Sequence, residues 1–313
     1  MKTILNQIIL LLLISNAFIV KAQDVNNLIS KGTQLYNAGK YTEAIPIFNE
    51  VIGKSPNSVN AWYNRGQCFY KTGNYDMAIQ DYSQVLRINP KYVDGWFQKG
   101  LCNNLRKNHN AAVADYSAGL AIAPNDAQLL YNRGIANADR NSLDSAMLDY
   151  NKAISINPNY TKAYLNRGTV FYRKKDFTSA VKDFSKTISL DANISEAWTN
   201  RAIVYTAQFF YDLALADYNQ ALKISPNNVK TLLNRGILYN KRKENNLAIA
   251  DLTEAIKIDP NYTSAYIMRG AIYYDTKQYE LSRNDLQKVL QLAPNNKFAT
   301  DLMVKINALP PKQ

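Results

Sequence analysis

The sequence contains few side chains that could do acid–base, nucleophilic or metal chemistry. Its 313 residues include one histidine, His109, and two cysteines, Cys68 and Cys102. A Ser-His-Asp or Cys-His site would have to be built on that one imidazole. No Gly-rich phosphate loop and no multi-ligand zinc pattern is present. We therefore predict that the protein is not an enzyme and has no metal site and no cofactor.

The elements that position the remaining side chains are revealed by an internal repeat. Glycine recurs every 34 residues, with Ala202 in the one vacant place, and alanine and proline recur in the same frame. An internal period of this length is the signature of a solenoid. The spacing defines eight repeats without insertion or deletion: 25–58, 59–92, 93–126, 127–160, 161–194, 195–228, 229–262 and 263–296. Gly32 is taken as position 8 of its repeat.

Each repeat contains two helical periods. In repeat 59–92, Trp62, Gly66 and Phe69 follow helical spacing, as do Ala78 and Tyr82 further on. A proline two positions after the second period ends it, because proline lacks an amide donor. One helix pair cannot bury its apolar face alone, so the repeats must stack into an all-α solenoid. Asn103 and Asn137 replace an aromatic residue at position 11, so we expect softer packing in their repeats.

These residues resemble the tetratricopeptide repeat (TPR) family. The match covers all eight repeats, in the pattern W-x2-[LR]-G-x2-[YF], then A-x3-[YF]-x2-A, then P. The resemblance implies a right-handed α-solenoid, a superhelix of helix-turn-helix units whose first helices line a concave groove for a protein or peptide partner. Residues 297–308 resemble a C-terminal capping helix with Phe298, Leu302 and Ile306 on one side, and 309–313 form a tail.

The first 22 residues have the features of a secretory signal peptide. Lys2 supplies a positive start, an apolar run covers 8–20, and Ala22 provides a small residue before a cut. The run is shorter than the ~20 residues of a membrane-spanning helix. We expect cleavage near Ala22, an exported chain that is periplasmic or secreted, and no membrane span. An uncleaved anchor is the alternative.

The net charge of +12 includes cations that we expect to be paired inside the scaffold. Position 7 is basic and position 23 is Asp in the same seven repeats, and the two positions can meet between the paired helices. The pairs are Arg65 with Asp81, Lys99 with Asp115, Arg133 with Asp149, Arg167 with Asp183, Arg201 with Asp217, Arg235 with Asp251 and Arg269 with Asp285. The remaining basic surface is too modest to predict a nucleic-acid partner.

Position 6 is the best candidate for partner binding. It is Asn64, Asn132, Asn166, Asn200 and Asn234 in five repeats. An amide can pair with either half of a peptide bond, and the family resemblance places this position in the groove. Aromatic residues at positions 5 and 12 share that surface: Tyr63, Phe97, Tyr131, Tyr70 and Tyr172. The alternative is that these asparagines bond within the scaffold.

Other features refine this interpretation. Phe209 and Phe210 lie at the turn of repeat 195–228 and form a possible second docking patch. The Lys, Asn and Arg pattern by which some TPR proteins bind chaperone carboxylates is missing at positions 5, 9 and 6, which disfavours that partner. Cys68 and Cys102 occupy the same apolar position in adjacent repeats, and helix axes ~8–10 Å apart favour buried thiols over a disulfide. We predict an exported protein-interaction scaffold; the alternative is a binder of anionic envelope polymer or glycan.

Overall fold

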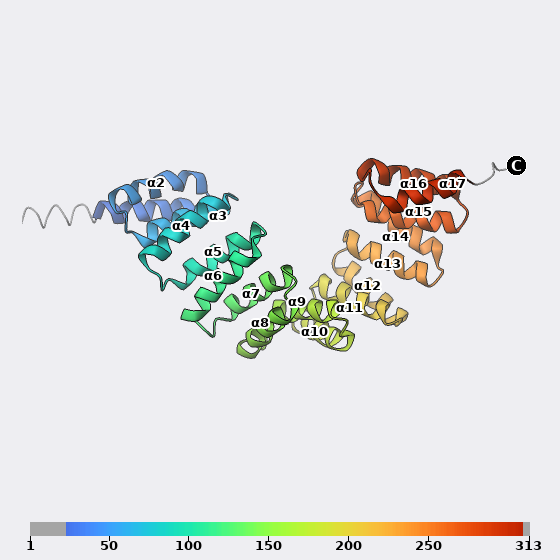
Figure 1. The fold of residues 1–313 in the computed structure, drawn as a ribbon, viewed down its shortest axis with the longest axis horizontal. Helices are drawn as coiled ribbons and strands as arrows, with labels where there is room; N and C mark the ends of the chain where they lie inside the picture. The colour runs from blue at the N-terminus through green and yellow to red at the C-terminus, as the bar shows by residue number, and fades with distance from the viewer. Residues whose placement is uncertain (1–22, 309–313) are drawn as a thin grey trace, which may run out of the picture. The chain divides into compact units, whose positions relative to one another are not determined.

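The computed structural model describes residues 23–308, which are helical throughout apart from short turns (Figure 1). The predicted leader, 1–22, and the tail, 309–313, lie outside the described residues. The chain divides into two compact units, Met1–Pro158 and Asn159–Gln313. Within each unit, consecutive helices from α2 to α8 and from α9 to α17 pack against each other. The predicted all-α solenoid is confirmed.

From α2 to α16, helices of 14 and 13 residues alternate. The N-terminal unit contains a helix at 23–37, then α2 (Tyr41–Lys54), α3 (Val59–Lys71), α4 (Tyr75–Ile88), α5 (Val93–Leu105), α6 (His109–Ile122), α7 (Ala127–Asp139) and α8 (Leu143–Ile156). The C-terminal unit contains α9 (Thr161–Arg173), α10 (Phe177–Leu190), α11 (Ser195–Ala207), α12 (Tyr211–Ile224), α13 (Val229–Lys241), α14 (Asn245–Ile258), α15 (Thr263–Asp275), α16 (Tyr279–Leu292) and α17 (Lys297–Asn307).

Local sequence sets the helix ends. Polar side chains cap several helices: Asp126, for example, accepts hydrogen bonds from the amides of Gln128 and Leu129 at the start of α7. The tight turn within each pair requires a left-handed residue at position 15. Gly73 has φ of 77° there, and later repeats place a residue with a side chain in this conformation, such as Phe209 at 65°.

Small residues at position 8 allow the paired helices to approach closely. A Cβ atom added to Gly134 would lie 2.6 Å from Cε1 of Tyr150, and one added to Gly100 would lie 2.7 Å from Cε1 of Tyr116. Both tyrosine rings are fully buried, as are Tyr82 and Tyr218 in the same repeat position. These aromatic residues fill the core between the helices, as their spacing predicts.

The seven predicted ion pairs all form between first and second helices. Each position-23 carboxylate is nearly buried, while its cation keeps between 15% and 27% of its side chain exposed. The N–O distances are 2.6 Å for Arg65–Asp81, 2.9 Å for Lys99–Asp115, 2.6 Å for Arg133–Asp149, 2.7 Å for Arg167–Asp183, Arg201–Asp217 and Arg235–Asp251, and 2.8 Å for Arg269–Asp285. Charge-assisted bonds of this kind stabilise the pairing of the helices.

The two asparagines at position 11, where we expected softer packing, are hydrogen-bonded to the carboxylates of the ion pairs. Asn103 and Asn137 are buried. Asn103 donates a 2.7 Å hydrogen bond to the Asp115 carboxylate, and Asn137 donates one of 2.9 Å to Asp149. Where other repeats have a ring, the amide makes a hydrogen bond, so the buried polar side chain has a partner.

Helix α17 covers the end of the C-terminal unit, as predicted for residues 297–308. Leu302 and Ile306 are buried against α16, together with Ala299. The expectation that Phe298 shares this face is wrong, because its side chain is 47% exposed. At about 100° per residue around the helix axis, Ala299 points about 40° from the mean direction of Leu302 and Ile306, and Phe298 about 60°.

Candidate functional site

The two cysteines form no reactive centre. Cys68 and Cys102 are free, buried thiols, as their apolar repeat position predicts. Burial, followed by the nearby Asp81 charge, raises the pKa of Cys68 to about 11. Burial and the Asp115 charge raise the pKa of Cys102 to about 12. A thiol must ionise to act as a nucleophile, so neither is suited to catalysis near neutral pH.

The single histidine is held by polar contacts with neighbouring side chains of the scaffold. Nδ1 of His109 lies 2.8 Å from Oδ1 of Asn104 and 3.9 Å from Oδ2 of Asp139. The ring is half-buried at the start of α6, where most repeats have an aromatic residue. Between residues 23 and 308, no group of His, Cys, Asp and Glu side chains is arranged to hold a metal ion.

A cavity of about 260 Å³ in the C-terminal unit combines several predicted binding residues. Its walls come from the first helices α9, α11 and α13, from the turn after α11, and from Tyr218 on the second helix α12. The lining residues are Tyr172, Ile203, Thr206, Ala207, Phe209, Tyr218, Asn234, Ile237 and Lys241. This groove cavity lies on the side that the family resemblance assigns to a partner.

Apolar and polar groups share the lining of the groove cavity. Ile203 and Ile237 provide apolar side chains one repeat apart, and Phe209 reaches the cavity from the turn. Tyr218 is almost fully buried, and this burial raises the pKa of its hydroxyl. The Lys241 side chain is exposed, so the cavity carries a cation at its edge. Such a site fits a bulky apolar side chain with a neighbouring acceptor group.

One of the five predicted asparagines lines the groove cavity. Asn234 lines the groove cavity, whereas Asn64, Asn132, Asn166 and Asn200 are half-buried residues outside its lining. The Asn234 amide donates a 2.8 Å hydrogen bond to the carbonyl of Lys230 in its own helix, and Asn132 does the same to Gln128. For these two residues the scaffold alternative accounts for one N–H of the amide, and the amide oxygen and the second N–H are left for a partner.

The predicted aromatic residues pack against second-helix rings. Ring centroids are 5.7 Å apart for Tyr63 and Tyr82, 6.2 Å for Phe97 and Tyr116, and 6.1 Å for Tyr131 and Tyr150. Tyr70 packs on Tyr75 and Tyr172 on Phe177, each at 5.9 Å. Burial raises the pKa of Tyr63 to about 12. Of this set, Tyr172 also lines the groove cavity.

The two turn phenylalanines have different surroundings. Phe209 is 73% exposed and lines the groove cavity. Phe210 is 53% exposed and packs edge-to-face on Tyr205, with centroids 6.4 Å apart. From the sequence, the groove and the turn were predicted as separate candidate sites. In the structure, Phe209 of the turn lines the groove cavity. Thr206 and Lys241 were not predicted; helical spacing from Ile203 and Ile237 was the signal that could have identified them.

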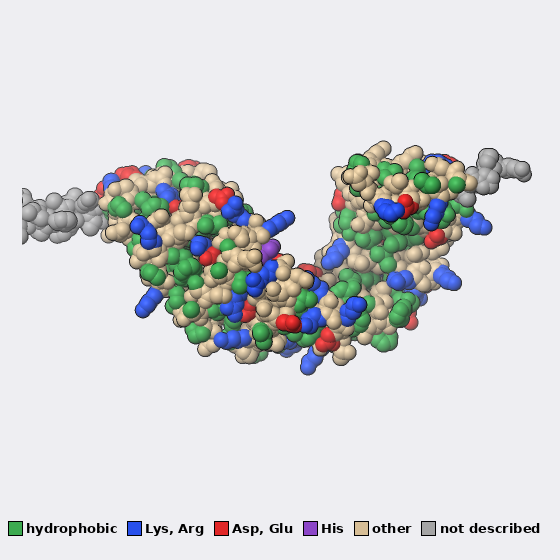
Figure 2. Space-filling view, in the orientation of Figure 1, with side chains coloured by type: hydrophobic (Ala, Val, Ile, Leu, Met, Phe, Trp, Pro, Cys, Tyr) green, Lys and Arg blue, Asp and Glu red, His purple; other side chains and the backbone are tan. Residues whose placement is uncertain are grey.

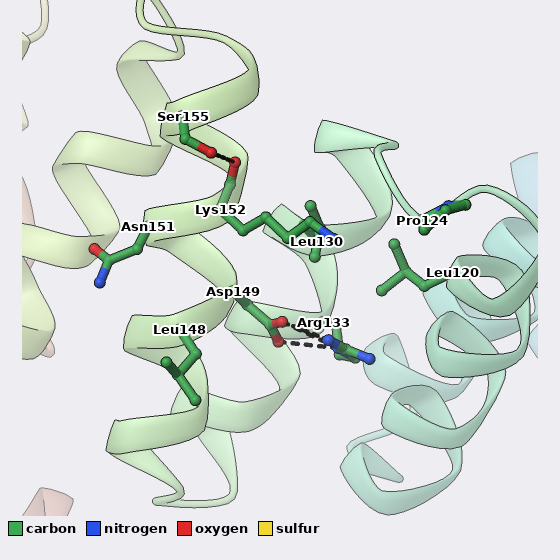
Figure 3. A pocket seen from close by; sticks show the side chains of 9 residues that line it. All are labelled: Leu120, Pro124, Leu130, Arg133, Leu148, Asp149, Asn151, Lys152 and Ser155. Carbon is green, nitrogen blue, oxygen red and sulfur yellow. Dashed lines mark hydrogen bonds and ion pairs between the residues drawn. The ribbon is translucent and has the colours of Figure 1, made fainter.

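A larger cavity of about 550 Å³ lies in the N-terminal unit, between α6, α7 and α8 (Figure 3). Leu120 and Pro124, Leu130 and Arg133, and Leu148, Asp149 and Lys152 line it from these three segments. Figure 3 shows the Arg133–Asp149 pair within it, and the Lys152 side chain extending toward Leu130. This cavity was not predicted from the sequence.

Charge on the surface is dispersed. On the face drawn in Figure 2, Lys and Arg side chains are scattered among apolar and acidic ones within each unit. This arrangement differs from the continuous basic stripe of a nucleic-acid-binding surface. As for membranes, none of the helices from residue 23 to residue 308 combines the length and apolarity needed to span one.

Family models match most of the chain. Models described as tetratricopeptide repeat match 31–58, 59–92, 161–194, 195–228, 229–262 and 263–296, and one described as TPR repeat matches 138–175. No curated protein matches the sequence.

Solved structures support the same fold. A tetratricopeptide repeat protein from Parabacteroides merdae is 19% identical over 80% of this chain and 99% of its own, with a TM-score of 0.66. A chain of the APC/C hetero-tetramer Cut9-Hcn1 is 16% identical over 89% of this chain, with a TM-score of 0.64, and this chain spans 55% of its length. YrrB, a TPR protein with an unusual peptide-binding site, is 17% identical over 59% of this chain and 95% of its own, with a TM-score of 0.51.

At these identities the solved structures show the fold alone. The repeat models, together with the paired helices and their 34-residue spacing, show the family. The chain belongs to the tetratricopeptide repeat family.

Proposed function

We propose that this chain is an exported, non-enzymatic scaffold that binds an extended segment of a partner protein in the groove of its C-terminal unit. One observation carries the proposal. The groove cavity combines Ile203 and Ile237 with the protruding Phe209, and places Asn234 and Lys241 beside them. Protein-binding sites commonly use an apolar or aromatic anchor surrounded by a few oriented polar groups.

The cavity favours a particular kind of partner segment. A bulky apolar side chain of the partner fills the space between Ile203, Phe209 and Ile237. The Asn234 amide oxygen can accept a backbone N–H from that segment, and its amide nitrogen, which donates one N–H to the carbonyl of Lys230, has a second N–H to offer. Lys241 then favours a carbonyl or carboxylate next to the apolar residue.

Two further observations support parts of the proposal. The charged start, apolar run and small residue at Ala22 support export. The fold is shared with YrrB, which is described as having an unusual peptide-binding site. Since that chain is only 17% identical, its peptide binding supports the class of activity and no individual contact.

Selection from a random peptide library tests the proposal. The native chain should enrich peptides with a bulky apolar residue, and Phe209→Ser should reduce their affinity by about tenfold, the loss of ~1.4 kcal/mol. Phe210→Ser is the matched control, because Phe210 packs on Tyr205 and lies outside the cavity lining. Equal loss in both variants, or none in either, would refute groove binding.

The alternative function is binding of an anionic envelope polymer or glycan. Exposed lysines at the inter-helix turns favour it, namely Lys107, Lys175, Lys243 and Lys277. Salt distinguishes the two functions, because exposed charges are screened beyond a Debye length of ~8 Å at physiological ionic strength. Polymer binding should fall steeply with added salt, whereas binding of an apolar anchor in the groove cavity should change little.

A further inference from the structure

In most repeats the cation at position 7 is held against one or two aromatic rings. Arg65, Arg167, Arg201 and Arg269 each lie within 6 Å of a ring from position 4 and a ring from position 11. In repeat 161–194, for example, Arg167 is 5.4 Å from the Tyr164 ring and 5.7 Å from the Phe171 ring. Cation–π attraction favours this arrangement.

Repeat 127–160 lacks both rings. Leu130 occupies position 4 and Asn137 occupies position 11. Arg133 is 27% exposed, compared with 15% to 17% for the four arginines that have two rings. Its Nε and Nη2 atoms donate to Asp149, and Nη1 donates to Ser117. Three of the five N–H groups are therefore engaged in the plane of the guanidinium, and its flat faces, which rings cover in other repeats, are available to a ligand.

Two cavities are lined by the residues that replace the missing rings. The cavity of about 550 Å³ includes Leu130 in its lining, and a second cavity of about 260 Å³ includes Asn137. Arg133, Leu148 and Asp149 line both. The larger one, drawn in Figure 3, also has Leu120 and Pro124 along its wall. Its volume is within the range of ~300–1,000 Å³ typical of ligand pockets.

The other repeats show which group fits this space. Trp62 lies 4.7 Å from Arg65, and its indole N–H donates a 2.7 Å hydrogen bond to the carbonyl of Pro56. Trp96 likewise lies 5.3 Å from Lys99 and donates to Pro90 at 2.9 Å. Pro124 is the equivalent of Pro56 and Pro90, and it lines the larger cavity. The cavity is therefore lined by Arg133 and Pro124, the counterparts of the cation and the proline that an indole contacts in repeats 59–92 and 93–126.

We propose that the larger cavity beside Arg133 binds the tryptophan side chain of a partner polypeptide, which takes the place of the missing position-4 ring. The indole stacks on the guanidinium of Arg133 and packs between Leu120 and Leu130. Leu148, at 71% exposure, offers apolar surface beside the cavity. A polypeptide can cover that surface with a neighbouring residue, whereas a single ring cannot.

Titration with N-acetyl-L-tryptophanamide, followed by ligand-observed NMR, tests the proposal. The native chain should bind this probe saturably in the millimolar range, and more tightly than N-acetyl-L-leucinamide. Leu130→Trp supplies the ring from the chain itself and should weaken binding by at least about tenfold. Leu232→Trp is the matched control, because Leu232 has the same repeat position but Arg235 keeps its Tyr239 ring at 5.8 Å. It should bind the probe as the native chain does.

A second variant and a second probe complete the test. The tripeptide acetyl-Leu-Trp-Leu-amide should bind more tightly than the single residue, and Leu148→Ser, at an exposed position, should remove that gain. Absence of saturable binding, equal binding of the leucine probe, or unchanged binding in folded Leu130→Trp would overturn the proposal. Free indole binding as tightly as the tripeptide would also overturn it, since the occupant would then be a small molecule.

Discussion

Arg167 and Asp183, 16 residues apart, are joined by two parallel hydrogen bonds. Nε donates to Oδ2 at 2.7 Å, and Nη2 donates to Oδ1 at 2.8 Å. Only 4% of the Asp183 side chain is exposed, while Arg167 keeps 17%. The pair links α9 to α10, and the same link recurs in the other repeats with a position-7 cation and a position-23 Asp. Seven of the basic side chains are therefore paired with carboxylates inside the scaffold.

Removing one partner of this pair should destabilise the C-terminal unit. Arg167→Ala leaves the buried Asp183 carboxylate unpaired, which should lower the free energy of unfolding by about 3 kcal/mol. Asp183→Ala should also be destabilising, and the double variant should cost less than the sum of the two. Denaturant unfolding of all three proteins measures this coupling. Strictly additive losses would show that the two side chains do not interact.

Gly134 should accept even a methyl group only at a cost in stability. An added Cβ would lie 2.6 Å from the buried Tyr150 ring, so Gly134→Ala must displace that ring or the helix that carries it and should cost about 1–3 kcal/mol. Gly53→Ala is the control in the same unit, because nothing lies within 4 Å of the new methyl group. It should be neutral or stabilising by up to about 1 kcal/mol, since alanine favours a helix. Thermal melts that rank the two variants the other way would contradict this packing.

The buried thiols should be unreactive in the folded chain. The pKa of Cys68 is raised to about 11 and that of Cys102 to about 12, so neither should react with a thiol reagent near pH 8 until denaturant is added. Rapid reaction without denaturant would show that these positions open.

The same shifts fix a direction for stability. The folded chain keeps thiol protons that the unfolded chain releases above the ordinary pKa near 9. The thiol contribution should therefore lower the free energy of unfolding as pH rises from about 9 to about 11. A double Cys68→Ala, Cys102→Ala variant should show a shallower fall over this range, measured by denaturant unfolding. An unchanged slope would contradict the thiol contribution.

Export should remove the predicted leader. The positive start, the apolar run at 8–20 and Ala22 predict a mature chain that begins at or near Gln23. Intact mass and N-terminal sequencing of the protein from its native host check this directly. A mature chain that retains Met1 would refute cleavage.

The sequence by itself determined the helix pairs and the main contacts between them. Position 8 glycines, position 24 rings and the position 7–23 ion pairs recur every 34 residues, so one repeat's packing could be extended to the others. This works because stacked repeats contact mainly their neighbours, and the same residue types meet at each step. The buried thiols followed from the same periodicity.

Only the tertiary structure decided which surface side chains act together. Phe209 and Asn234 are 25 residues apart in different repeats, yet they line one cavity, while Phe210 turns to Tyr205. A repeat pattern assigns a residue to a face, but a cavity depends on side-chain directions from several helices and a turn. The cavity beside Arg133 likewise depends on what Leu130 and Asn137 fail to fill, and whether neighbouring side chains close such a space is a property of the packed structure.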